Sequence, residues 1–187
     1  DTAVVHGSPG RRFSADYSIR SQLIGRDAFW MAAKYGEVEI FKILLAEGAD
    51  PFSTDGGGVT TLQVAMGNSG SSLDWRRDRI GNEALDLEDE ERRTLELTRL
   101  LIDAGVDVNA KDDRGRAAIH HAVLKDFPKV VEYLALRGAD IHMPNDRGLT
   151  PFALADTEQS IPGTNGLRGT RPKVAELLRR LGADASE

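Results

Sequence analysis

The sequence predicts an all-α solenoid of about four helix-turn-helix repeats, with short finger hairpins or loops between the repeats and two insertions within them. A Gly-x-Asp turn closes each expected repeat and occurs four times, at Gly48, Gly105, Gly138 and Gly182. The spacing from each of the first three closing glycines to the glycine that opens the next repeat is constant: Gly48 to Gly58, Gly105 to Gly115 and Gly138 to Gly148. One helix pair cannot bury both of its faces, so stacked copies are needed to form a continuous core.

The most regular copy of the repeat runs from Arg114 to Asn145. It holds two short stretches with apolar residues at helical spacing. The positions equivalent to His120 are Trp30, Gln63 and Ala153. The spacing from this position to the closing glycine is the same in the first and third repeats, but it is longer in the second and fourth. The second and fourth repeats therefore carry insertions, and without them the period is about 33 residues.

This period, with a Thr-Pro-Leu-His-like start and a Gly-Ala-Asp exit, resembles that of the ankyrin repeat family. The resemblance covers about residues 22 to 184, less the insertions. It implies stacked helix pairs and a concave surface that binds other proteins. The residues that carry it are Thr60-Thr61-Leu62-Gln63, Ala117-Ala118-Ile119-His120, Thr150-Pro151-Phe152-Ala153 and the exit from Gly105 to Ala110.

The repeat pattern predicts a single domain, residues 1–187. We expect an N-terminal cap or arm (1–26), repeat 1 (27–57), repeat 2 (58–114), repeat 3 (115–147) and repeat 4 (148–187). The insertions are expected at about 67–93 and about 157–171. Residues 1–26 fit no complete repeat. We interpret them as a cap over the first helix pair rather than as a recognition arm, because repeat arrays need polar or covered ends.

Repeat 1 is expected to bury an apolar stripe, with Gly36 at the tight turn between its two helices. Trp30 is interpreted as a core residue. Lys34 and Tyr35 lie just before the turn, at positions that the resemblance assigns to the concave binding surface. The alternative is that both are solvated surface residues without a binding role.

Repeat 2 is expected to place one helix near Thr60 to Met66 and the next at about Thr94 to Ala104, with the insertion between them. Acidic residues precede the second helix, and Glu88–Arg92 and Asp89–Arg93 are spaced as (i, i+4) pairs. Acidic residues also suit the dipole at a helix start. We therefore expect this helix to extend toward Glu88, and we favour a solvated helix start over a calcium site.

Repeat 3 contains adjacent histidines. The resemblance implies that His120 makes hydrogen bonds within and between neighbouring loops, and we expect His121 to point toward the concave side. Neighbouring residues on a helix diverge by about 100 degrees, and no cysteine or further histidine completes a metal site. Asn109, in the exit of repeat 2, is expected to satisfy backbone groups of the finger turn.

Repeat 4 is expected to begin its second helix at Pro172, where the missing N–H costs nothing. Arg179 and Arg180 replace the apolar residues of repeat 1, Leu45 and Ala46, as suits a terminal cap.

Composition and motifs exclude several classes of function. The net charge of −6 argues against a nucleic-acid partner. No apolar run approaches the roughly 18 residues of a membrane span. The chain has no cysteine, and no P-loop, dinucleotide-binding, nucleophile-elbow or zinc-protease motif. We predict no catalytic residues, no metal and no cofactor.

The sequence therefore predicts a non-catalytic module that binds a partner protein through its concave face, through a cleft between the insertions, or through both. Arg114 and Arg147 stand one repeat period apart at matching finger positions, which suggests an acidic strip on the partner. The candidate residues of the concave face are Lys34, Tyr35, Arg114, Arg116, Leu124, Lys125, Arg147 and Leu149.

Both insertions fall at the turn between the two helices of their repeats, so they are expected to emerge at the same end of the stack, on either side of the turn at Phe127. We interpret Phe127 as the floor of a shallow cleft. Exposed Trp, Phe and Arg side chains dominate binding hot spots. The alternative is that the two loops fold over one another. The expected walls are Trp75, Arg76, Arg77, Arg79, Leu167, Arg168 and Arg171.

Two other functions stay open from the sequence. The insertions could form a small-ligand or weak hydrolase-type site, or the chain could serve as an accessory subunit of a larger complex. The insertion pattern also resembles ankyrin proteins of bacteria that are often exported, which favours a periplasmic or exported location over a cytoplasmic one.

Overall fold

The computed structural model describes residues 27–55, 57–66, 87–160 and 168–183. Helices account for most of these residues, and one pair of two-residue strands accompanies them. The helices are α1 (Ala28–Tyr35), α2 (Val38–Ala46), α3 (Thr61–Ala65), α5 (Leu87–Asp103), α6 (Ala118–Lys125), α7 (Pro128–Leu136), α8 (Pro151–Asp156) and α9 (Pro172–Arg180). The strands are β1 (Gln159–Ser160) and β2 (Arg168–Gly169).

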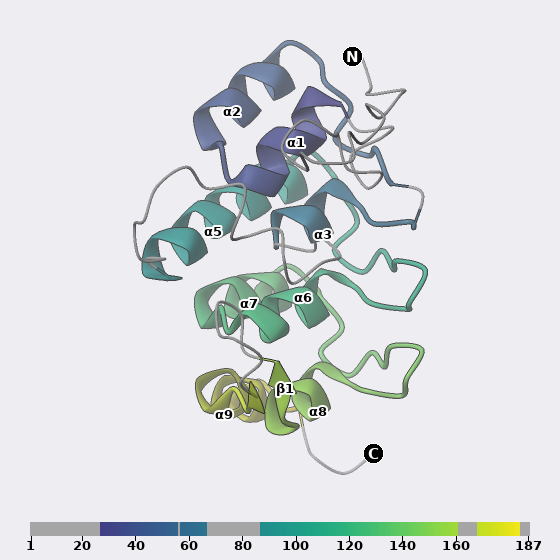
Figure 1. Ribbon diagram of the computed structural model, residues 1–187, viewed down its shortest axis with the longest axis vertical. Coiled ribbons are helices and arrows are strands. Elements are labelled where there is room, and N and C mark those ends of the chain that lie inside the picture. Colours follow the sequence, from purple (N-terminus) through teal and green to yellow (C-terminus); the bar gives the residue numbers. More distant parts are fainter. Residues whose placement is uncertain (1–26, 56, 67–86, 161–167, 184–187) are drawn as a thin grey trace, which may run out of the picture.

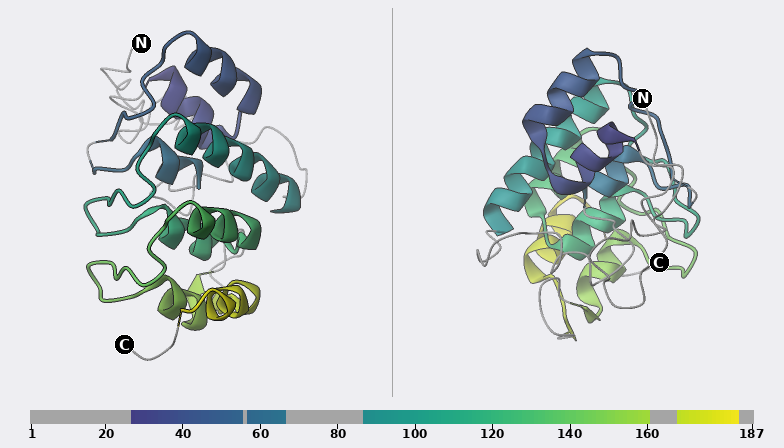
Figure 2. Two further views of the ribbon diagram at one scale, coloured as in Figure 1. Left: turned by 180° about the vertical axis from the view of Figure 1, so that it is seen from behind. Right: turned by 45° about the horizontal axis from the view of Figure 1, so that its top comes forward.

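The helices form two layers that run the length of the stack (Figures 1 and 2). In the inner layer α1, α3, α6 and α8 pack in that order, and in the outer layer α2, α5, α7 and α9 do the same. Each inner helix also packs on the outer helix of its own repeat. Loops before α6 and α8 project from the inner layer as fingers, on the right in Figure 1. The predicted fold class, an all-α repeat solenoid, is confirmed.

Each inner helix of repeats 1, 2 and 4 begins at an acceptor that the sequence supplies. The Asp27 carboxylate accepts the Trp30 N–H (2.7 Å), and the Thr150 hydroxyl accepts the Ala153 N–H (3.2 Å). Thr60 caps α3 in a reciprocal capping box with Gln63. Side-chain acceptors of this kind satisfy N–H groups that lack a partner in the first turn. They fix where the inner helix starts.

The turn between inner and outer helices is tight and uses a left-handed residue. Gly36 fills this position in repeat 1 with φ +70°, and Asp126 fills it in repeat 3 with φ +61°. Aspartate is one of the few residues other than glycine that adopts this conformation readily. The short turn keeps α6 and α7 in contact along their length.

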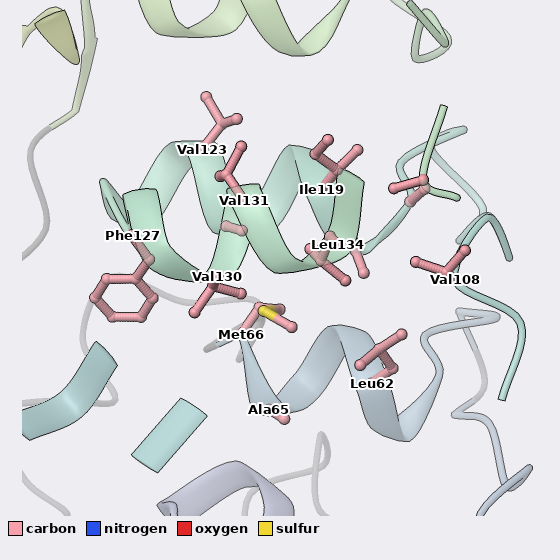
Figure 3. Close-up of a cluster of buried hydrophobic side chains, with 14 of the residues drawn as sticks. Leu62, Ala65, Met66, Val108, Ile119, Val123, Phe127, Val130, Val131 and Leu134 are labelled. Atoms are coloured by element: carbon pink, nitrogen blue, oxygen red, sulfur yellow. The ribbon is translucent and has the colours of Figure 1, made fainter. Parts of the chain in front are cut away.

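The core is continuous between neighbouring repeats. Figure 3 shows Leu62 of α3 and Met66, the residue that follows α3, facing the side chains of Val130 and Leu134 on α7. All four are 0–1% exposed. Because each repeat buries apolar residues against the next, the inner surface of the stack is held as one unit.

The predicted extension of the second helix of repeat 2 toward Glu88 is confirmed, whereas the strands in the second insertion were not predicted. Helix α5 begins at Leu87 and has 17 residues, against nine in α2, α7 and α9. Residues 87–93, which repeat counting assigned to the first insertion, are therefore helical. In the second insertion β1 and β2 pair antiparallel, with Gln159 opposite Gly169. The sequence predicted a glycine-rich loop there, and short strands of this kind leave no periodic signal.

Candidate protein-interaction surface

Each finger is built on one buried or half-buried polar side chain. The Asp112 carboxylate oxygen Oδ1 accepts the N–H groups of Arg114 and Arg116, both at 2.9 Å. Asn145 Oδ1 accepts those of Arg147 (2.8 Å) and Leu149 (3.1 Å) in the same way. Asp55 repeats the arrangement in the first finger. Aspartate and asparagine favour such turns because their short side chains reach the backbone two residues on.

Backbone hydrogen bonds join successive fingers. The Asp113 N–H donates to the Gly57 carbonyl (3.0 Å), and the Asp146 N–H donates to the Arg114 carbonyl (3.1 Å). Gly115 has φ +67°, and a Cβ placed on it would lie 2.8 Å from the Asp146 nitrogen. The fingers therefore form one connected edge, and glycine is required where they approach each other.

Arg114 and Arg147 lie exposed on this connected edge. In the described part of the chain neither guanidinium takes part in an ion pair. Asp113 and Asp146 are exposed beside them, and their carboxylates lie against the glycine of the preceding finger. The edge therefore exposes the guanidinium groups of Arg114 and Arg147 one repeat apart, while the Asp113 and Asp146 carboxylates lie against the preceding finger.

Arg116 is engaged within the protein rather than free. Its Nε and Nη2 donate to Asp112 Oδ2 at 3.0 and 2.7 Å, and its side chain is 18% exposed. Burial opposes ionisation of Asp112, but the neighbouring His121 and the Arg116 guanidinium outweigh it, so the pKa of Asp112 lies below its usual value. Arg116 therefore rigidifies its finger and is a weaker candidate for partner contact than Arg114.

The expectation for His121 is wrong. The sequence placed it toward the concave side, but it is buried (4% exposed), with Nε2 3.6 Å from Asp112 Oδ2. Burial lowers its pKa, which keeps the ring neutral. The finger of repeat 3 folds over the inner helix and covers this side chain, an arrangement that the helical periodicity of α6 alone does not reveal.

The structural role predicted for His120 is confirmed, whereas Asn109 bonds to the closing turn of the next repeat and not to the finger turn as predicted. His120 Nδ1 accepts the Ala117 N–H (3.1 Å), and Nε2 lies 2.9 Å from the Met143 carbonyl oxygen. Asn109 Nδ2 donates to the Gly138 carbonyl, and its Oδ1 accepts the Asp140 N–H, both at 2.9 Å. Both residues tie one repeat to the finger or closing turn of the next.

The other concave candidates lie at the far ends of the inner helices from the fingers. Lys34 and Tyr35 end α1, and Lys34 Nζ lies 5.1 Å from the Tyr35 ring centroid. Leu124 and Lys125 end α6 and are half-buried. Since α6 has eight residues, roughly 12 Å separates this end from the fingers. Arg114 and Arg147 therefore form one group, and Lys34, Tyr35, Leu124 and Lys125 belong to another part of the inner layer.

Lys125 is already paired. Its Nζ lies 2.9 Å from Glu90 Oε1 on the N-terminal extension of α5, and both side chains are little more than one-fifth exposed. The neighbouring Glu91 is 6% exposed, and its Oε1 accepts the Lys129 N–H at the start of α7 (2.6 Å). Glu91 thus supplies the cap that Phe127 cannot. The sequence showed the helical extension but not this contact, which needs the neighbouring repeat to be in place.

Phe127 is not the floor of a cleft. It is 2% exposed and belongs to the core between α3, α6 and α7 (Figure 3). Arg171, placed on the cleft wall, is also 2% exposed. Its guanidinium donates to the carbonyls of Gly169 (2.5 Å) and Leu124 (3.1 Å). Both residues precede an outer helix, where the adjacent turn covers them.

The other expected cleft residues lie outside the described part of the chain. They are Trp75, Arg76, Arg77, Arg79 and Leu167, with the side chain of Arg168. The cleft and the small-ligand or hydrolase-type site that it would form stay predictions. Among the described residues no group of three or more His, Asp or Glu could hold a metal ion. No helix of this part is long and apolar enough to cross a membrane.

The described structure is a helical-repeat solenoid with hydrogen-bonded fingers, and comparison with known proteins gives its family. Models of the ankyrin repeat match residues 91–155, as many copies, and residues 25–56, as a single repeat. Together they cover just over half of the chain. The chain belongs to the ankyrin repeat family.

Relatives share its repeats over only part of their length. Human neurogenic locus notch homolog protein 1 is 32% identical over 143 residues, which is 70% of this chain and 6% of that protein. An ankyrin repeat protein of Acanthamoeba polyphaga mimivirus is 36% identical over 67 residues, 36% of this chain and 9% of the relative. Human protein phosphatase 1 regulatory subunit 27 is 34% identical over 64 residues, 34% of this chain and 42% of the relative. The chain thus spans less than half the length of each. Ankyrin repeats are generally protein–protein interaction modules rather than enzymes.

Proposed function

We propose that this chain binds a partner protein through the finger edge, defined here as Arg114, Arg147 and Leu149 with the backbone that joins them. The observation that carries the proposal is the fixed spacing of two exposed arginines that form no ion pair with any other described residue. Backbone N–H groups that donate to Asp112 and Asn145 fix each finger, and backbone hydrogen bonds between fingers fix their spacing. A preorganised surface loses little conformational entropy when it binds.

The partner that fits this edge carries acidic residues spaced to meet two arginines. Arginine is suited to such a contact because its planar guanidinium binds a carboxylate through two hydrogen bonds. Leu149 is half-buried beside Arg147 and offers an apolar contact at the base of the same finger. The named role of one relative, a regulatory subunit of protein phosphatase 1, is compatible with a stable accessory subunit.

The test is a charge reversal at both fingertips. The chain would be captured with its partners from the native source, the partner identified by mass spectrometry, and its affinity measured for the parent and for Arg114→Glu with Arg147→Glu. We expect the double variant to bind at least 10-fold more weakly, with a smaller dependence of affinity on salt. Each lost charge-assisted contact that is desolvated in the complex is worth on the order of 1.5–3 kcal/mol.

The matched control is Lys173→Glu with Arg180→Glu, which makes the same change in net charge on exposed residues of α9, away from the fingers. We expect this control to bind like the parent. If both double variants bound the partner equally weakly, the loss of affinity would be due to the change in net charge and not to the finger edge. Unchanged affinity in the fingertip variant would contradict binding through the finger edge.

A further inference from the structure

One end of the stack leaves uncovered a position that every later repeat buries. The residue eight positions before the closing glycine faces the preceding repeat. In repeats 2, 3 and 4 it is Leu97, Val130 and Val174, and each is 0% exposed. In repeat 1 it is Ile40, which is 51% exposed. In the later repeats the preceding repeat covers this position, and Ile40 has no described preceding repeat to cover it.

Neighbouring positions of repeat 1 are also more exposed than their equivalents in later repeats. Ile43 is 62% exposed, whereas Leu100 and Tyr133 are half-buried and Leu177 is 5% exposed. In the inner layer Met31 is half-buried, whereas its equivalents Val64 and Leu154 are 0% and 3% exposed. We call the surface formed by Met31, Ile40, Ile43 and Leu44 the N-terminal face. It lies at the top of the stack in Figure 1, on α1 and α2.

The opposite end of the described stack carries charged side chains on α9. Arg179 of α9 stands where Leu45, Ile102 and Ala135 stand in the earlier repeats. Its guanidinium lies 4.9 Å from the ring centroid of Phe152 and 3.8 Å from the Asp156 carboxylate. A second copy stacked head to tail would therefore press a charged end against the apolar N-terminal face. This end does not fit as the cover.

We propose that residues 1–26 of the same chain cover the N-terminal face. This segment is joined directly to Asp27, the N-cap of α1, and α1 carries part of the N-terminal face. Fully extended, 26 residues reach about 85 Å at roughly 3.3 Å each, and the nine-residue α2 is only about 14 Å long. The attachment also gives the segment a high effective concentration at this face.

The segment matches the face in both polarity and charge. It contains apolar residues for the face, Val4, Val5, Phe13, Ile19 and Leu23 among them. It also carries four arginines against two aspartates, whereas α2 with its two caps carries three glutamates against one lysine. That lysine, Lys42, is already shared between Glu39 and Glu96. The net acidic helix that carries the apolar face is therefore complementary in charge to the net basic, partly apolar segment.

The cover is not a further regular repeat. Counting one period back from α2 gives residues 5–13, and this stretch contains Gly7, Pro9 and Gly10. These residues oppose an outer helix of the length seen in α2. Such a cap meets the requirement that a repeat array end in a covered face. The proposal does not depend on binding through the finger edge.

Hydrogen–deuterium exchange of the 187-residue chain tests the proposal. In Ile40→Lys with Ile43→Lys we expect the amides of residues 1–26 to lose at least 10-fold in protection, while α7 and α9 keep theirs as proof of folding. The matched control is Leu136→Lys, since Leu136 is 76% exposed on the outer layer. We expect the control to exchange like the parent.

The reciprocal variant changes only the segment. Val4→Asp with Val5→Asp is expected to speed amide exchange in α2 and to leave α7 unchanged. Two results would overturn the proposal: exchange of residues 1–26 as fast in the parent as in the face variant, or sedimentation of the parent as a dimer that the face variant disperses. The second result would assign the face to a second copy.

Discussion

At the scale of single residues, the connected fingers depend on a glycine with no room for a side chain. A Cβ on Gly115 would meet Asp146 of the next finger, whereas a Cβ on Gly148, at φ +72° in the last finger, meets nothing within 4 Å. Both glycines have left-handed backbones, which cost other residues about 1–2 kcal/mol. We expect Gly115→Ala to destabilise more than Gly148→Ala by about 1 kcal/mol or more, measured by urea unfolding. Equal losses would show that the contact between fingers adds nothing to the backbone cost.

His120 makes stability depend on pH. Burial lowers its pKa to about 4 from a usual value near 6.5. Between pH 6.5 and pH 4, His120 is therefore protonated in the unfolded chain and neutral in the folded chain. The free energy of unfolding falls as the pH falls through this range. From pH 7 to pH 5 the expected loss from this residue is about 2 kcal/mol. His121 adds to the loss in the same direction, because its pKa is also lowered.

The variant His120→Gln separates the contribution of His120 to the pH dependence of stability from that of His121. Gln63 fills the same position in repeat 2, where it accepts the Thr60 N–H and donates to the carbonyls of Ala110 and Arg116. Glutamine can thus replace the hydrogen bonds of His120 without titrating. We expect the variant to keep most of its stability at pH 7 and to lose about 2 kcal/mol less than the parent on going to pH 5. The free energy of unfolding at the two pH values decides this, and an unchanged pH dependence would contradict it.

At the scale of elements, the extension of α5 holds the start of α7. The Glu91 carboxylate accepts a part-buried backbone N–H from Lys129, while Glu88, one turn earlier, pairs with the exposed Lys129 ammonium at 3.4 Å. Loss of a helix cap costs about 0.5–2 kcal/mol, and an exposed ion pair is worth little. We expect Glu91→Ala to lower the free energy of unfolding by about 1–2 kcal/mol and Glu88→Ala to change it by less than about 0.5 kcal/mol. Equal effects of the two variants would show that Glu91 acts only through charge.

The position of Phe127 shows why part of the site escaped sequence reasoning. Its equivalents in repeats 2 and 4 are Thr94 and Arg171, and all three residues are 2–4% exposed. Considered singly, Phe127 and Arg171 have the side chains of a binding hot spot. Their burial follows from the neighbouring repeat and turn, which no periodicity within one helix encodes.

At the scale of the whole molecule, repetition made the fold predictable. The spacing of closing glycines predicted the helix pairs and the fingers, because a contact between repeats recurs in sequence as well as in space. The role of His120 was implied by the resemblance to the ankyrin repeat family. The insertions occur once each and have no such recurrence. The pairing of β1 with β2 therefore could not be read from the repeat, and the extension of α5 toward Glu88 was predicted from its acidic first turn and (i, i+4) pairs instead. Exposed Arg114 and Arg147 were found because they sit on the repeated finger.

Stability should also follow the order of the repeats. Leu101, Leu134 and Leu178 occupy the same outer-helix position in repeats 2, 3 and 4, and each is 0% exposed. Truncation of each to alanine leaves a cavity that costs about 2–5 kcal/mol. In a stack where each repeat touches only its neighbours, the position of the cavity decides which helices open.

We expect Leu178→Ala to increase hydrogen exchange in α8 and α9, while α3 and α5 stay protected. Leu134→Ala, which lies centrally, should lower protection on both sides of the defect, in α5 as well as in α9. Loss of protection at every helix alike in all three variants would contradict nearest-neighbour behaviour, because it would show that the described repeats open only as one cooperative unit.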